Sequence, residues 1–124
     1  MKIMTKKLIL RDWNYQSNNR PALFLDRDGV LIKDCHYISK PEDVSLCDGA
    51  CELVWHAFRN KIPVIIITNQ SGISKGLFNW NDYDLVTEKM LNLLGKPSPI
   101  TAIYANAYNV VKDLKSWRKP SPEM

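Results

Sequence analysis

The sequence predicts an α/β fold in which a Rossmann-like open parallel sheet is flanked by helices. Two short, continuous apolar runs, at residues 22–25 and 64–67, each end in a turn that contains polar residues and glycine. Short unbroken apolar runs bounded by turn residues are typical of strands buried on both faces of a parallel sheet. A helical pattern lies between the two runs, and the order strand, helix, strand indicates a βαβ unit with a right-handed crossover.

Two helices and a third strand complete the predicted order. The first helix is expected at Ala50–Asn60, with Asp48 as its cap, and a proline follows the pattern at residue 63. A second amphipathic pattern runs from about Trp80 to Leu94, with Asn79 as its cap. Residues 100–104 form the third apolar run, so the order β-α-β-α-β indicates an open α/β sheet.

The net positive charge belongs to the beginning of the chain. The 124 residues include 17 Lys and Arg and 13 Asp and Glu, a formal net charge of +4. Residues 1–11 hold four basic residues and no acidic one, so the rest is balanced, which argues against a nucleic-acid-binding surface on the folded body. Residues 1–20 are expected to form a basic, polar lead-in with a weak strand pattern at Leu8–Leu10, and residues 21–124 one domain.

Apolar patterning and cysteine content favour a cytoplasmic protein that has no membrane partner. The run at Leu8–Leu10 is far shorter than the roughly 7–15 apolar residues of a signal-peptide core. No run approaches the roughly 18 apolar residues of a membrane span. The cysteines at positions 35, 47 and 51 form no recognisable disulfide framework and are expected to remain reduced.

Two aspartates follow the first predicted strand, where open α/β sheets bind their ligands. Asp26 and Asp28 are separated by one residue, and Gly29 permits a tight turn after them. Two neighbouring carboxylates repel each other unless a cation lies between them, which implies a hard ion such as Mg²⁺. One carboxylate can attack an electrophile while the other moves protons. Taken alone, the pair is also explained by a solvated turn or a helix cap.

The second predicted strand ends in Thr68 and Asn69, which suit phosphate binding. A hydroxyl and successive backbone N–H groups in a glycine-containing turn can hold a phosphate. Lys119, next to Arg118, offers a cation for the same anion. The three segments together therefore indicate chemistry on a phosphate group.

These segments resemble the first three motifs of the haloacid-dehalogenase-like (HAD-like) phosphatases. They are Phe24–Leu31, which contains D-R-D-G, Val64–Ile73, which contains T-N-Q-S-G-I, and Arg118–Met124, which reads R-K-P-S-P-E-M. Within that superfamily they are similar to the branch that contains histidinol phosphatase and D-glycero-D-manno-heptose-1,7-bisphosphate 7-phosphatase. The resemblance extends over about residues 21–124.

The resemblance implies a Mg²⁺-dependent phosphomonoesterase that works through an aspartyl-phosphate. Asp26 matches the nucleophile and Asp28 the general acid and base, and Mg²⁺ would be held by the Asp26 carboxylate and the Asp28 main-chain carbonyl. Thr68 and Lys119 would stabilise the transferring phosphoryl oxygens. The other residues expected to contact the substrate are Arg27, Asp34, Tyr37, Asn69, Gln70, Ser71 and Arg118.

The substrate is expected to be a small phosphorylated sugar, a precursor of surface polysaccharide such as lipopolysaccharide. The heptose enzyme is favoured over histidinol phosphatase because Asp34-x-x-Tyr37 and Lys75-Gly76-x-Phe78 resemble it in full. A polynucleotide 3′-phosphatase has a similar second motif, but the balanced charge of residues 12–124 argues against it. A phosphate-binding remnant or inactive fragment without turnover is the non-enzymatic alternative.

The sequence departs from the family pattern in three ways. The four residues at the zinc-ligand positions of the heptose enzymes cannot bind zinc, so no zinc is expected; they are Ala105, Ala107, Lys115 and Trp117. Ile32 stands where the branch usually has Asn, so an amide contact is lost there. No counterpart of the fourth, acidic motif precedes Met124, so truncation and a sheet that lacks its C-terminal strands are expected.

Overall fold

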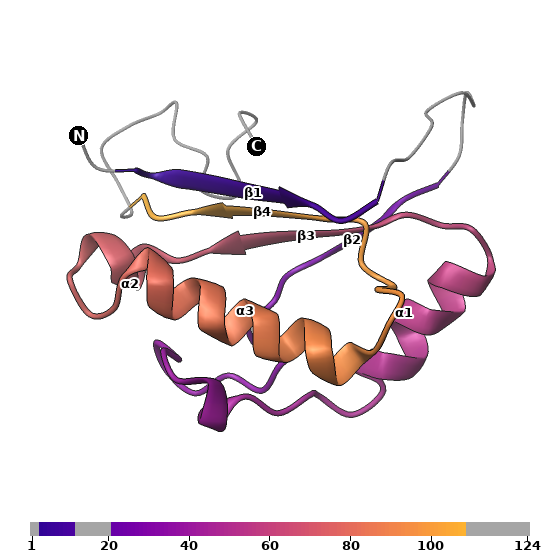
Figure 1. Ribbon diagram of the computed structural model, residues 1–124, viewed down its shortest axis with the longest axis horizontal. Helices are drawn as coiled ribbons and strands as arrows, with labels where there is room; N and C mark the ends of the chain where they lie inside the picture. The colour runs from indigo at the N-terminus through magenta and orange to yellow at the C-terminus, as the bar shows by residue number, and fades with distance from the viewer. Residues whose placement is uncertain (1–2, 12–20, 109–124) are drawn as a thin grey trace.

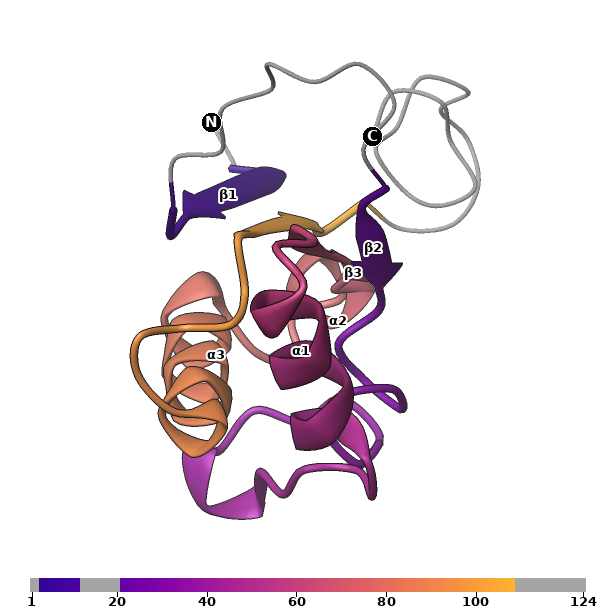
Figure 2. The ribbon, with the colours of Figure 1, turned by 90° about the vertical axis from the view of Figure 1, so that its right-hand side faces the viewer.

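A four-stranded sheet and three α-helices on one of its faces make up the described part of the computed structural model, residues 3–11 and 21–108 (Figure 1 and Figure 2). The strands are β1 (Thr5–Ile9), β2 (Leu23–Leu25), β3 (Val64–Asn69) and β4 (Ala102–Asn106), in the spatial order β1-β4-β3-β2. The helices are α1 (Ala50–Arg59), α2 (Ser71–Ser74) and α3 (Trp80–Leu94), and the short 3₁₀ helix η1 is Pro41–Asp43. The predicted α/β order is therefore confirmed.

The sheet is mixed, although the sequence predicts a parallel one. β3 pairs in parallel with β2 and with β4, as expected of strands joined by helical crossovers. β1 pairs antiparallel with β4 over five residues, from Thr5 opposite Asn106 to Ile9 opposite Ala102. This strand lies within the expected lead-in, and its pairing satisfies backbone groups that β4 would otherwise present at an edge. An ion pair between Lys6 and Asp84 joins β1 to α3.

The two strands from the first apolar runs differ in burial. Val64, Ile65 and Ile66 of β3 are all buried, as the unbroken apolar run predicts for a central strand. Phe24 of β2 is 59% exposed, contrary to the expected burial of that run on both faces. The reason is that β2 is an edge strand among the described strands and Phe24 points away from the face that the helices cover.

The hydrophobic core lies between the sheet and helices α1 and α3. Its largest members come from β3, β4, α1 and α3 and pack side by side; they include Ile66, Ile103, Val54, Met90 and Leu94. Burying a side chain of this size contributes about 1.5–3 kcal/mol to stability. No helix in the described part of the chain has the length and apolar character needed to cross a membrane.

The two long helices begin in different ways. Asn79 caps α3 as predicted: its Oδ1 accepts a hydrogen bond from Asp82 N at 2.8 Å, and Asp82 Oδ2 accepts one from Asn79 N at 3.0 Å. The predicted cap of α1, Asp48, is wrong, because Gly49 occupies that position with a φ of +80°. Glycine adopts this left-handed conformation without strain, and the helix still begins at Ala50, as expected.

We predict that Asn79→Ala lowers the free energy of unfolding by about 1 kcal/mol, because it removes the reciprocal cap of α3. Chemical denaturation monitored by circular dichroism measures the change. Asn81→Ala is the matched control, since Asn81 is exposed in the first turn of the same helix and is not its cap. Equal losses in the two variants would contradict the role of the cap.

Candidate active site

The turn after β2 brings two carboxylates to the carboxyl edge of the sheet. The main-chain oxygen of Arg27 accepts hydrogen bonds from Leu31 N and Ile32 N, both at 3.0 Å. Gly29 N donates to Ile32 O at 2.8 Å, and its φ of +85° is one that only glycine adopts readily. This closed turn fixes the backbone between Asp26 and Asp28, and both aspartates remain partly accessible.

Residues from the end of β3 join this turn. Because Leu25 pairs with Ile66 in parallel register, the segments that follow β2 and β3 leave the sheet at the same edge. The side chain of Gln70 bridges them: its Nε2 donates to Asp28 Oδ2 at 3.1 Å and to Thr68 Oγ1 at 2.8 Å. The structure therefore brings together the chemical residues that the sequence predicts from the first two runs.

The side chain of Arg27 is buried against helix α3. Its side chain has no exposed surface, and its Nε donates to Asp28 Oδ1 at 2.8 Å while Nη2 lies 3.3 Å from Asp28 Oδ2. Nη1 donates to Thr87 Oγ1 at 3.0 Å, and the guanidinium carbon lies 5.2 Å from the centre of the Tyr83 ring. Arg27 thus contacts α3 and the neighbouring aspartate, and its expected contact with the substrate stays a prediction.

Burial sets the state of Tyr83. It raises the pKa of the Tyr83 phenol above its ordinary value, and the positive charge of Arg27 opposes this shift only in part. The phenol therefore stays neutral under physiological conditions and presents a π face to the guanidinium. The roles of Tyr83 and Thr87 were not predicted from the sequence. The available signal was a hydroxyl side chain, Thr87, on the apolar side of the predicted helix and one turn after Tyr83.

The loop at residues 34–37 lies beside the turn that carries Asp28. The Cβ of Asp34 lies 3.9 Å from the position that a Cβ on Gly29 would occupy, and the Asp34 side chain is exposed. His36 and Tyr37 have φ values of +32° and +58°, a conformation that is costly for residues other than glycine. Lys75 Nζ donates to the Tyr37 hydroxyl at 2.7 Å. Asp34 and Tyr37 are therefore placed near the predicted site, in a strained loop.

Asn69, at the end of β3, is held by a residue that the sequence analysis did not single out. Asn106 Nδ2 donates to Asn69 Oδ1 at 2.7 Å, and the Asn106 main-chain oxygen accepts from Gln70 N at 2.6 Å. The Asn106 side chain is fully buried. Ser71 follows as the first residue of α2. The expected contacts Arg118 and Lys119 lie outside the described residues.

The positions that match zinc ligands in the heptose enzymes are partly visible. Ala105 and Ala107 are buried in a small apolar cluster with Ile73, Phe78 and Tyr83. Lys115 and Trp117 lie outside the described residues. Ile32, which replaces the usual Asn, is fully buried in the main core. These three described positions therefore serve packing in this chain.

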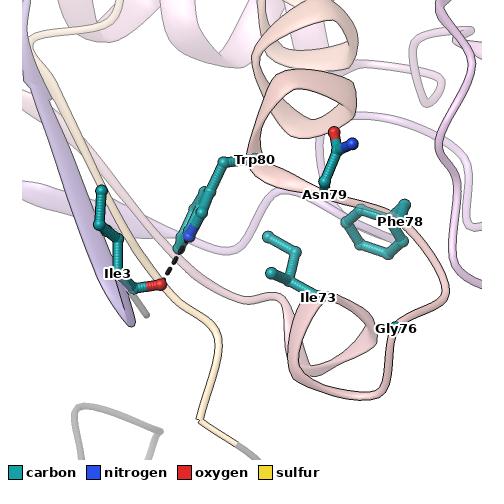
Figure 3. Close-up of a pocket in the computed structure, with 6 residues that line it drawn as sticks. All are labelled: Ile3, Ile73, Gly76, Phe78, Asn79 and Trp80. Atoms are coloured by element: carbon teal, nitrogen blue, oxygen red, sulfur yellow. Dashed lines mark hydrogen bonds between the residues drawn. The ribbon is translucent and has the colours of Figure 1, made fainter. Parts of the chain in front are cut away.

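A pocket of about 390 Å³ lies between α2, the start of α3 and the segment before β1 (Figure 3). It is lined by Ile3, Ile73, Gly76, Phe78, Asn79 and Trp80, none of them charged. The Trp80 indole Nε1 donates to Ile3 O at 2.7 Å, which ties the segment before β1 to the start of α3. None of the expected site residues lines this pocket.

Gly72 lets the rings of Tyr37 and Phe78 approach the backbone of α2. A Cβ at Gly72 would lie 2.4 Å from Phe78 Cε1 and 2.8 Å from Tyr37 Cδ1, closer than atoms can pack. The absence of a side chain is therefore what allows the loop that carries Tyr37 to lie against α2.

Several curated relatives match the chain in sequence. It is 37% identical over 112 residues to D-glycero-beta-D-manno-heptose-1,7-bisphosphate 7-phosphatase of Mesorhizobium japonicum, covering 84% of this chain and 51% of the relative. It is 41% identical over 75 residues to D-glycero-alpha-D-manno-heptose-1,7-bisphosphate 7-phosphatase of Campylobacter jejuni, covering 60% of this chain and 44% of the relative. The chain spans about half the length of the curated relatives it matches. No protein-family model matches it.

Solved structures share the fold. A putative HAD-like phosphatase from Mesorhizobium loti superimposes with a TM-score of 0.83 and 31% identity, over 96% of this chain and 60% of that one. The D,D-heptose 1,7-bisphosphate phosphatase of B. bronchiseptica, complexed with magnesium and phosphate, gives a TM-score of 0.71 and 25% identity, over 83% of this chain and 58% of that one.

We predict that Gly72→Ala destabilises the chain by roughly 1–3 kcal/mol, because the new methyl group overlaps both rings. The sign of the change in the free energy of unfolding is informative, since alanine in place of glycine inside a helix otherwise stabilises the helix by up to about 1 kcal/mol. Thermal and urea unfolding measure the change. In a Phe78→Leu background the same substitution should cost less, and an equal cost there would contradict the overlap.

Proposed function

Sequence and fold both relate this chain to the HAD-like phosphatases, and from this relationship we propose that it hydrolyses a sugar phosphate monoester through an aspartyl-phosphate. D-glycero-D-manno-heptose 1,7-bisphosphate, cleaved at its 7-phosphate, is the proposed substrate, because the matching relatives are named for that reaction. Since the chain spans about half of those relatives, its own turnover is part of the proposal.

The observation that carries this proposal is the gathering of Asp26, Asp28 and Thr68 at one edge of the sheet. The Gln70 side chain bonds to both Asp28 and Thr68, so one side chain links the acid to the hydroxyl, which is itself fully buried. A phosphate bound at this edge would meet a carboxylate on one side and hydrogen-bond donors on another. Such an arrangement suits in-line phosphoryl transfer, in which positioning and charge stabilisation supply most of the catalysis.

The proposed reaction has two steps. A carboxylate oxygen of Asp26 attacks phosphorus as the bond to the sugar oxygen breaks, and the Asp28 carboxyl group donates its proton to that leaving oxygen. The Asp28 carboxylate then takes a proton from a water molecule that attacks the aspartyl-phosphate, which releases phosphate and regenerates Asp26. Thr68 and Lys119 would stabilise the phosphoryl oxygens in both steps.

The donor set at the turn fits Mg²⁺. The resemblance implies the Asp26 carboxylate and the Asp28 main-chain carbonyl as the ligands, and the Asp28 carboxylate has its own partners in Arg27 and Gln70. Oxygen donors of this kind are those that Mg²⁺ prefers. Within the described residues, no third His, Cys, Asp or Glu joins these two aspartates in a group that could hold a metal. The proposed site therefore leaves coordination positions for water and for the phosphate, as Mg²⁺ usually does. When bound, Mg²⁺ would neutralise the charge of the carboxylate and the phosphate.

The rest of the sugar would contact residues that surround this edge. Asp34 and Tyr37 lie in the adjacent loop, and Asn69 and Ser71 follow the end of β3. Arg118 is a further proposed contact. Histidinol phosphatase remains the alternative enzyme, and the names of the relatives favour the heptose substrate over it. A phosphate-binding remnant is the alternative without turnover.

We predict that Asp26→Asn abolishes phosphate release from heptose 1,7-bisphosphate, with a loss on the order of 10³-fold or more, because the amide cannot attack phosphorus. Release of inorganic phosphate in the presence of Mg²⁺ measures the effect. Asp48→Asn is the matched control, since Asp48 is exposed at the start of α1 and should leave the rate unchanged. A folded wild-type chain that releases no phosphate would instead support the phosphate-binding remnant.

Removal of divalent cations should also abolish phosphate release, and added Mg²⁺ should restore it, since two carboxylates and a phosphate repel each other without a cation. Titration of the chelated protein with MgCl₂ measures the recovery. Calorimetry on the Asp26→Asn variant provides the control, because that variant should bind Mg²⁺ more weakly. Full activity after exhaustive chelation would contradict the proposed metal dependence.

A further inference from the structure

We propose that Arg27 and Thr87 are positioning residues, through which helix α3 fixes the orientation of the Asp28 carboxylate at the active site. The inference rests on the proposed function, in which Asp28 is the general acid and base. Neither residue would touch the substrate. Thr87 lies on α3, outside every segment that the sequence analysis identified as chemical.

Arg27 contacts Asp28 at two points. The guanidinium meets both carboxylate oxygens, through Nε at 2.8 Å and Nη2 at 3.3 Å. A planar fork that contacts both oxygens restricts rotation of the carboxylate, which a single contact does not. Neighbouring residues of an extended chain point to opposite faces, so this contact depends on the tight turn that follows Arg27.

The Arg27 side chain is itself held in place. The guanidinium is fully buried, so its charge has to be balanced by protein groups in place of water. Nη1 donates to Thr87 Oγ1 at 3.0 Å, and the Tyr83 ring lies against the guanidinium. Both contacts come from the buried side of α3, so the helix determines the plane of the fork.

The contacts of Asp28 also leave a defined place for the proton that it must carry. Oδ2 accepts from Gln70 Nε2 at 3.1 Å in addition to its longer contact with Arg27, whereas Oδ1 accepts from Arg27 Nε. A carboxylate oxygen has two lone pairs, so Oδ1 keeps one that can hold a proton for the leaving group. Because Arg27 and Gln70 occupy the other acceptor positions of the carboxylate, the proton on Oδ1 points in one defined direction, which a general acid needs.

The kinetic test compares two substrates that differ in their need for an acid. The 7-phosphate of heptose 1,7-bisphosphate is an alkyl phosphate, whose sugar oxygen is a poor leaving group unless it is protonated. In p-nitrophenyl phosphate the leaving group is p-nitrophenolate, which departs without a proton. Thr87→Val and Arg27→Lys should lower kcat/KM for the alkyl phosphate about 10-fold, a fraction of the full contribution of a general acid, and kcat/KM for the aryl phosphate less than about 3-fold. The comparison uses kcat/KM because it reports the transfer to Asp26, whereas kcat also includes hydrolysis of the aspartyl-phosphate, in which Asp28 acts on both substrates alike. Equal losses on both substrates, or no loss, would overturn the proposal.

Thr101→Val is the matched control. Thr101 is also buried, and its hydroxyl accepts a hydrogen bond from Val64 N at 3.1 Å, at the opposite end of the strands from Asp28. It removes a buried hydroxyl without touching the contact network of Arg27. The ratio of the two kcat/KM values should therefore remain at the wild-type value in Thr101→Val, even if the variant is less stable.

A measurement without turnover tests the same geometry. In the nuclear magnetic resonance spectrum, the Arg27 Nε–H should exchange with water far more slowly than that of the exposed Arg59. Thr87→Val and Asp28→Asn should accelerate this exchange, and Thr101→Val should not. Exchange of Arg27 as fast as that of Arg59 would overturn the proposal whatever the phosphate assay gives. A protected Arg27 in a chain that releases no phosphate would support the fixed geometry and count against the proposed function alone.

Discussion

The parallel pairing of β3 with both of its neighbours is the constraint on which the candidate site depends. Leu25 of β2 pairs with Ile66, and Asn69 pairs with Asn106 of β4, so three strands deliver their following residues to one edge. Side chains alternate along a strand, so a slip of one residue would turn Thr68 away from the helices and from Gln70. The apolar packing of Ile66 and Ile103 against α1 and α3 therefore also fixes the positions of the polar groups.

A buried charge connects this edge to the core. Arg27 is surrounded by Asp28, Thr87 and Tyr83, and Tyr83 belongs in turn to the apolar cluster around Phe78. Removing one partner of a fully buried ion pair costs about 3–5 kcal/mol, and the partial exposure of Asp28 reduces that figure here. Even the lower part of this range is a large share of the stability of a small domain. The packing of α3 and the orientation of Asp28 are therefore coupled.

Features encoded locally could be predicted from the sequence. The cap of α3 follows from Asn79 and Asp82, three residues apart, and the burial of β3 follows from its unbroken apolar run. Features that depend on distant partners could not. β1 exists because β4, about 97 residues later, offers an edge for it, and the burial of Arg27 depends on a hydroxyl 60 residues away. The resemblance of the D-R-D-G segment to the family suggested a contact between Arg27 and the substrate, and nothing nearby in the sequence indicates the partner on α3.

The site combines a rigid part with an adaptable one. Asp28 is held by buried partners, whereas Tyr37 is held by Lys75, whose side chain is exposed and whose hydrogen bond competes with water. Exposed contacts of this kind contribute little to stability, so the strained backbone at His36 and Tyr37 has to be maintained mainly by ring packing over Gly72. On the proposed function, changes in this loop would alter which sugar phosphate fits and leave the geometry of proton transfer intact. Substrate range and catalytic chemistry would then be separable, because they depend on different elements of the fold.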